Sequence, residues 1–236
     1  MPEEETSSSI IRTLRALAKP RAKKDMERFG IFAGKSLGGI STPALKKLAR
    51  QIGRNHQLAD ELWKSGIREA RHVAHMIDEP ERVTEKQMER WAKDFDSWDI
   101  VDGCCLYLFC KTPHAHRKAV DWSKRKEEFV KRAAFSLMAY LAVHDKNASE
   151  EKLLKFLPII QRESIDERNF VKKAVNWALR QIGKRNVNLN QAAIKTGEQI
   201  RKIDSRSARW IAADALRELK SAPVQARLHA QRLRSA

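Results

Sequence analysis

The chain has 236 residues, enough to bury a substantial core in one extended domain or two small ones. The chain has 47 Lys and Arg residues and 30 Asp and Glu residues, which gives a formal charge of +17. This charge indicates a polyanionic partner. Nucleic acid is the first candidate, because a protein that neutralises its phosphates releases condensed counterions. No apolar run reaches the roughly 20 residues of a transmembrane helix, and the acidic start MPEEETSSS is unlike a signal peptide, so we expect a cytoplasmic protein without a membrane partner.

The cysteine and histidine residues indicate neither a disulfide framework nor a metal site. The chain has three Cys, an odd number, and they lack the C-x-x-C spacing of zinc sites. Two close His pairs have no Cys or carboxylate at a matching spacing. We therefore expect a reducing compartment, no metal and no cofactor. The residues concerned are Cys104, Cys105, Cys110, His72, His75, His114 and His116.

Apolar residues recur at intervals of three and four along nearly the whole chain, which is the period of amphipathic α-helices, and no alternating strand pattern interrupts them. We expect an all-α fold of short helices stacked in pairs, an α-solenoid of HEAT-like helical repeats, with a compact helical bundle as the alternative. No low-complexity linker divides the chain. We predict a flexible N-terminus over 1–9, a single helical repeat domain over 10–222 and a basic C-terminal helix or tail over 223–236.

Short local patterns predict where several helices begin and end. Pro43 suits the first turn of a helix. Thr84 and Gln87 have the spacing of a capping box, and Ser149 precedes EEKLLKFLP, whose first acids favour the N-terminal turn of a helix. Helix ends are expected at Gly66 and Gly183.

The segment DSWDIVDGCC, residues 96–105, places aromatic and acidic side chains on one helical face. If Ser97 caps this helix, Trp98, Asp102 and Cys105 follow at positions i, i+4 and i+7 of that face. The positive end of the helix dipole would keep a carboxylate there ionised. In isolation the pattern also allows a structural interpretation, in which Trp98 belongs to the core and Asp99 or Asp102 merely decorates the N-terminus of the helix.

Two later segments combine cations with an aromatic residue. FVKRAAFSLMAYLAVH places Lys131 and Arg132 where its apolar stripe permits an exposed cation, and NFVKKAVNWALRQIGK surrounds Trp177 with cations and amides. Such residues suit phosphate contact and stacking. We expect them to line a concave, positively charged groove, the alternative being that each run is a solvated outer face. The expected DNA-binding residues are Arg132, Lys131, Lys172, Lys173, Arg180 and Lys184.

In their order and separation, DSWDIVDGCC, FVKRAAFSLMAYLAVHD and ERNFVKKAVNWALRQIGKRN resemble segments of the AlkD-like DNA alkylation repair family. MERFGIFAGKSLGGISTPALKKLAR is similar to that family's N-terminal segment. The resemblance implies a HEAT-like solenoid that holds duplex DNA, and a monofunctional glycosylase that excises positively charged N3- or N7-alkylpurines. It also implies a catalytic cleft made of Trp98, Asp102 and Trp177, with Arg132 holding the DNA nearby.

The implied residues suit that chemistry. A cationic alkylpurine is already a good leaving group, and Asp102 can stabilise the oxocarbenium-like sugar and orient water. Trp98 and Trp177 can pack on the sugar and backbone. We expect a monomer that needs no cofactor and binds duplex DNA containing alkylated bases in the cytoplasm, associated with the nucleoid. A non-catalytic binder of damaged or branched DNA and a protein-interaction scaffold are the alternatives.

Overall fold

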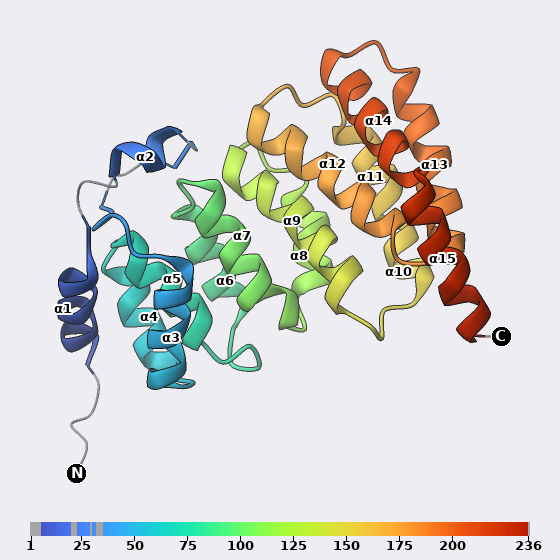
Figure 1. The fold of residues 1–236 in the computed structure, drawn as a ribbon. Coiled ribbons are helices and arrows are strands. Elements are labelled where there is room, and N and C mark those ends of the chain that lie inside the picture. The colour runs from blue at the N-terminus through green and yellow to red at the C-terminus, as the bar shows by residue number, and fades with distance from the viewer. Residues whose placement is uncertain (1–5, 20–22, 29, 32–34, 236) are drawn as a thin grey trace. The chain divides into compact units, whose positions relative to one another are not determined.

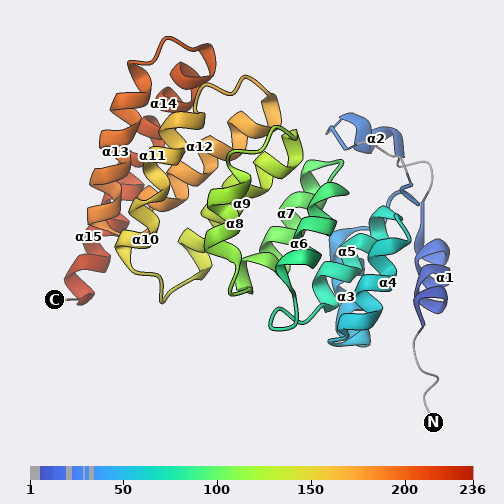
Figure 2. The same ribbon diagram turned by 180° about the vertical axis from the view of Figure 1, so that it is seen from behind.

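The computed structural model describes residues 6–19, 23–28, 30–31 and 35–235. Every regular element within that part of the chain is helical, as Figure 1 and Figure 2 show, so the predicted all-α fold is confirmed. Of the predicted flexible N-terminus, residues 1–5 lie outside the described part. Thr6 caps the first helix through its side chain, so the rest of that segment is structured. Residues 29 and 32–34, within the segment that resembles the family's N-terminus, also lie outside it.

The chain divides into two compact units, residues 1–113 and 114–236. The helices of unit 1 are α1 (Ser7–Leu17), α2 (Lys23–Arg28), α3 (Thr42–Ile52), α4 (His56–Lys64), α5 (Arg68–Ile77), α6 (Glu85–Lys93), α7 (Trp98–Tyr107) and the 3-10 helix η2 (Phe109–Lys111). The helices of unit 2 are α8 (Ala115–Trp122), α9 (Glu128–His144), α10 (Glu150–Leu154), α11 (Phe156–Glu163), α12 (Asn169–Gly183), α13 (Val187–Arg201), α14 (Arg206–Leu219) and α15 (Ala222–Ser235). The single domain predicted over residues 10–222 stays a prediction.

In unit 1, α5 is the helix around which its neighbours pack, with contacts to α3, α4 and α7. Aromatic side chains from α4 and α6 fill the core beside it. The rings of Trp63 and Trp91 stack with centroids 4.0 Å apart, and Trp63 also donates a hydrogen bond of 2.9 Å to Asp94. Burial of both indoles with a satisfied N–H stabilises the stack that supports α5.

In unit 2, α12 takes the central position, packed against α9, α13 and α14 (Figure 1). Gly183 was expected to mark a helix end, and it is the last residue of α12. Its role there is close packing, because a Cβ at this position would lie 2.7 Å from Leu219 and 2.8 Å from Ala193. Only glycine therefore lets α12, α13 and α14 approach so closely.

The local start patterns are largely confirmed. Thr84 caps α6 and accepts a hydrogen bond from the backbone N–H of Gln87, and Ser149 occupies the N-cap position of α10 without a side-chain cap hydrogen bond. The segment after Ser149 forms two helices, α10 and α11, separated at Lys155. Pro158 lies in the first turn of α11, where a backbone N–H would have no helical partner and its absence costs nothing. In the interior of one continuous helix from Glu150 the missing N–H would break the hydrogen-bond pattern, so the segment forms two helices.

Candidate active site and nucleic-acid interface

Helix α7 places the predicted catalytic pair on one half-exposed face. Ser97 is its N-cap residue, as expected, and Trp98 and Asp102 lie one turn apart, both half-buried. Ile100 and Cys105 are fully buried against the core. The apolar side of α7 therefore faces inward, and the side that carries the indole and the carboxylate borders solvent. Cys105, which the spacing places near the same face, is a buried packing residue.

The first turn of α7 is fixed by Asp99, which the structural interpretation of the sequence had placed at the N-terminus of this helix. One oxygen of Asp99 accepts hydrogen bonds from Arg68 and, at 2.9 Å, from Nε2 of His72, and the other accepts one of 2.7 Å from Ser97. Burial alone would raise the pKa of Asp99, but the hydrogen bond from His72 and the charge of Arg68 outweigh it and lower that pKa. Asp99 is thus a stable anion that ties α7 to α5.

Behind Asp99 lies a buried histidine pair. Nδ1 of His72 lies 3.1 Å from Nε2 of His75, whose ring stacks on Tyr107 with centroids 5.4 Å apart. Burial, with the nearby charge of His72 adding to it, holds the pKa of His75 well below its usual value. The backbone of α7 passes so near this ring that a Cβ at Gly103 would lie 2.6 Å from Nε2 of His75.

Unit 1 also has a basic cleft that the sequence analysis missed. It has a volume of about 370 Å³ and is lined by Lys46, Arg50, Arg54 and Tyr107, with no acidic residue in its wall. The ammonium of Lys46 lies 5.4 Å from the centre of the Tyr107 ring. The three cations are four residues apart in the sequence, a spacing that could have predicted a basic helical face, although Arg54 lies just beyond the end of α3.

Unit 2 carries the second predicted tryptophan on α12. Trp177 is half-buried, and Tyr140 meets its ring edge-on with centroids 4.8 Å apart. Lys173 lies one turn before Trp177, is exposed and, within the described residues, makes no ion pair. Lys172 places its ammonium 5.4 Å from the centre of the Trp210 ring. The expected combination of an aromatic ring with cations is therefore present on α12.

Three of the predicted DNA-binding cations are paired with acids. Lys131 lies 2.6 Å from Glu163, while Arg180 and Lys184 both bind Glu218. Such pairs cancel part of the positive charge that a phosphate would meet. A phosphate would have to compete with these carboxylates for the same donors.

Arg132 does not have the exposure that its position in the apolar stripe predicted. Its side chain is 7% exposed, and Nη1 donates a hydrogen bond of 2.8 Å to the carbonyl oxygen of Phe170. The physical reason is that α9 packs against both α8 and α12, so little of this helix borders solvent. Arg132 therefore also links α9 to the start of α12.

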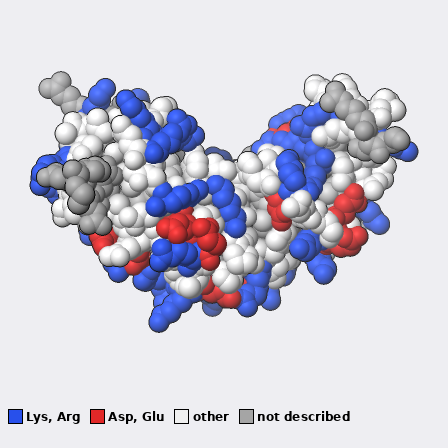
Figure 3. All heavy atoms as spheres, turned by 90° about the horizontal axis from the view of Figure 1, so that it is seen from below, with Lys and Arg blue, Asp and Glu red and all other residues white. Residues whose placement is uncertain are grey.

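Exposed charge is predominantly positive on the face drawn in Figure 3. Among the described residues there is no group of three or more His, Cys, Asp or Glu side chains arranged to hold a metal ion. No helix in the described part of the chain is long and apolar enough to cross a membrane.

Short helices packed in pairs are typical of HEAT-like helical repeat proteins. Comparison with a solved structure supports that class. The structure, described as "a new family of proteins related to the HEAT-like repeat DNA glycosylases with affinity for branched DNA structures", matches with a TM-score of 0.74. The two proteins are 22% identical, and the match covers 91% of this chain and 95% of the other. This likeness confirms the predicted fold.

The chain belongs to the DNA alkylation repair enzyme family, whose model matches residues 10–219. It is also 23% identical over 209 residues to the uncharacterized protein Lin0241 of Listeria innocua serovar 6a, a match that covers 81% of this chain and 92% of that protein. The family predicted from the sequence segments is thereby confirmed.

Proposed function

We propose that the protein is a monofunctional DNA glycosylase that removes positively charged N3- or N7-alkylpurines from duplex DNA. The observation that carries the proposal is the placement of Trp98 and Asp102 on one half-exposed face of α7. The network around Asp99 fixes the first turn of that helix. A rigid support is what electrostatic stabilisation of a transition state requires, because the charge must not reorganise as the reaction proceeds.

The proposed chemistry rests on the charge that develops in the substrate. The alkylated base leaves as a neutral purine, while positive charge builds on the deoxyribose as the glycosidic bond stretches. In the proposal, Asp102 stabilises that charge and orients the attacking water. Trp98 and Trp177 pack on the sugar and backbone, with their negative ring faces toward the cation. Because the leaving group already carries a charge, the reaction needs no cofactor and no lysine nucleophile.

Binding of the undamaged backbone is assigned to the unpaired cations. Lys173 on α12 and the cleft of Lys46, Arg50 and Arg54 in unit 1 offer positive charge without a neighbouring carboxylate in the cleft wall. Lys131, Lys172, Arg180 and Lys184 remain proposed contacts. Arg132 remains one as well, although its bond to Phe170 gives it a structural role. We expect these residues to supply the salt-dependent part of the affinity.

The test is release of N7-methylguanine from a duplex that contains one such base. We expect release by the wild-type protein, and Asp102→Asn should lower the rate at saturating enzyme on the order of 100-fold, as loss of one fixed transition-state contact does. DNA binding should be retained, because the substitution removes a negative charge. Asp96→Asn, which removes an exposed acid outside α7, is the matched control. If the wild-type protein binds the duplex but releases no base, the glycosylase proposal is wrong.

The second candidate function is binding of branched DNA without catalysis. It is favoured by the similar solved structure, which is described as having affinity for branched DNA. Titration of a four-way junction and a linear duplex of equal length separates the candidates. Preference for the junction, together with no base release, supports the binder. An affinity for either DNA that does not change with salt would instead favour a scaffold for an acidic protein.

A further inference from the structure

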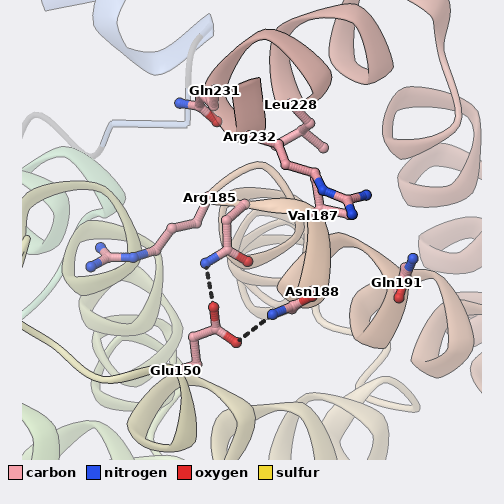
Figure 4. A pocket seen from close by; sticks show the side chains of 9 residues that line it. Glu150, Arg185, Val187, Asn188, Gln191, Leu228, Gln231 and Arg232 are labelled. Carbon is pink, nitrogen blue, oxygen red and sulfur yellow. Dashed lines mark hydrogen bonds between the residues drawn. The ribbon is translucent and has the colours of Figure 1, made fainter. Parts of the chain in front are cut away.

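Unit 2 has a second basic surface, close to α15 and separate from the residues assigned above to the reaction. Two adjoining clefts, with volumes of about 820 and 430 Å³, share Arg185, Asn186 and Gln231 in their walls. Figure 4 shows the larger cleft, with side chains from α13 and α15 around it. We call the cations that line the two clefts the C-terminal basic surface; they are Lys146, Lys184, Arg185, Arg227 and Arg232.

Positive charge exceeds negative charge in these walls. The carboxylate that lines them is Glu150, and it already accepts hydrogen bonds of 2.8 Å from Asn186 and 3.3 Å from Asn188. Arg185 donates to the carbonyl oxygens of Ala142 in α9 and of Lys146 and Ala148 in the segment that follows. Its position is therefore fixed, while no carboxylate among these partners cancels its charge. A fixed guanidinium is well suited to a phosphate, which it can bind without losing further side-chain entropy.

Helix α15 is docked in a way that leaves its cations at the surface. Leu228 is 2% exposed and anchors the helix, and Gln225 donates a hydrogen bond of 2.6 Å to the carbonyl oxygen of Leu219. Arg227 donates one of 2.8 Å to the carbonyl oxygen of Lys184, while Arg232 is exposed in the cleft wall. The helix has no acidic residue. The tail predicted as basic is thus an ordered helix with cations on its solvent side.

The surface is continuous with the face of α12 that carries Trp177. Lys173, Trp177 and Lys184 lie at intervals of four and seven residues, and therefore on one side of that helix. Lys184 belongs both to this side and to the smaller cleft. A phosphate backbone bound along α12 would reach α15 past Lys184, for which it would compete with Glu218.

We propose that the C-terminal basic surface binds a DNA phosphate backbone beyond the segment that holds the lesion. The neutral amides in the larger cleft, Asn188, Gln191 and Gln231, provide N–H donors to phosphate oxygens beside the cations. Because the carboxylate of Glu150 is already held by Asn186 and Asn188, and the remaining charges in the walls are cations, we expect the contact to be with the backbone and independent of sequence. The proposal rests on the DNA-binding part of the proposed function and does not require base excision.

The first test is the salt dependence of binding to an unmodified duplex. The double variant Arg227→Ala, Arg232→Ala should lower the slope of log K against log salt by about 1.8, since each lost phosphate contact contributes about 0.9. The control Lys202→Ala, Arg206→Ala removes the same charge from exposed positions at the C-terminal end of α13 and the start of α14. These positions lie about 20 Å from the cleft along α13, and the control should change the slope by less than about half a unit. Equal slopes for the wild-type protein and the first double variant would overturn the proposal.

Loss of the Arg227 bond to Lys184 could detach α15, so a second pair of variants keeps the test independent of folding. p-Benzoylphenylalanine in place of Gln191 should crosslink to bound duplex on irradiation, because Gln191 is exposed and lines the cleft. The same group in place of Gln199, exposed two turns further along α13, should not. Absence of a crosslink at Gln191, or equal crosslinking at both positions, would contradict the proposal. A crosslink at position 191, together with no base release by the wild-type protein, would overturn the glycosylase and leave this surface in place.

Discussion

Nε2 of His72 lies 2.9 Å from a carboxylate oxygen of Asp99, and this bond joins α5 to the first turn of α7. A carboxylate can only accept, so the proton of the bond belongs to His72. Arg68, at the start of α5, donates to the same oxygen. Two donors on α5 therefore hold the helix that carries Trp98 and Asp102, and the position of the candidate catalytic face depends on residues of a neighbouring helix.

Asp99→Asn should destabilise the fold by about 3 kcal/mol, because it leaves Arg68 with a weaker partner in a largely buried position. Urea unfolding at pH 7 measures the change. Asp60→Asn is the matched control, since Asp60 pairs with Lys64 and Arg90, whose side chains are 63% and 49% exposed. Exposed pairs contribute less than about 1 kcal/mol. Similar losses for the two variants would show that Asp99 does not fix α7.

Stability should fall as the pH drops below about 6.5, in part because of His75. The pKa of His75 is lowered in the folded protein, so as the pH falls the unfolded chain binds a proton at a higher pH than the folded protein does. The stability that the neutral ring contributes is present above the unfolded pKa and is lost as the pH falls, at up to about 1.4 kcal/mol per pH unit. His75→Gln removes the titrating ring, and its unfolding free energy between pH 7.5 and 5.5 should fall less steeply. Parallel curves would contradict this role.

Gly103→Ala should cost about 2 kcal/mol in unfolding free energy, because the added methyl group meets the His75 ring, which cannot move in a fully buried site. A double-mutant cycle isolates the cause. With His75→Ala as the background, the methyl group has room, and the same substitution at residue 103 should cost less than about 1 kcal/mol. Equal costs in the two backgrounds would mean that the contact is not responsible.

Lys173 and Arg132 should respond differently to truncation. Lys173→Ala should lower the salt slope of duplex binding by about 0.9 while changing the melting temperature little, because the residue is exposed. Arg132→Ala should lower the melting temperature by several degrees as well, since it removes the bond to the Phe170 carbonyl in a buried site. Anisotropy titration at several salt concentrations and thermal unfolding measure the two effects. If the salt slope of either variant equals that of the wild-type protein, the substituted residue does not contact a phosphate.

Much of the fold followed from the sequence because its signals act over short range. The helical period, the N-cap positions of Thr84 and Ser149, and the shared face of Trp98 and Asp102 depend on residues at most a few positions apart. Such interactions form whenever the local segment is helical, whatever packs against it. The family could be predicted as well, since its segments follow one another in the right order.

Other features depend on partners far away in the chain. Lys131 meets Glu163, and Arg68 and His72 meet Asp99, only because separate helices bring them together. The burial of Arg132 likewise depends on α9 having neighbours on two sides. The sequence by itself determined the helices and the face that carries the candidate chemistry. Only the tertiary structure decided which cations are paired and what holds α7, because pairing and burial are set by contacts between helices rather than within them.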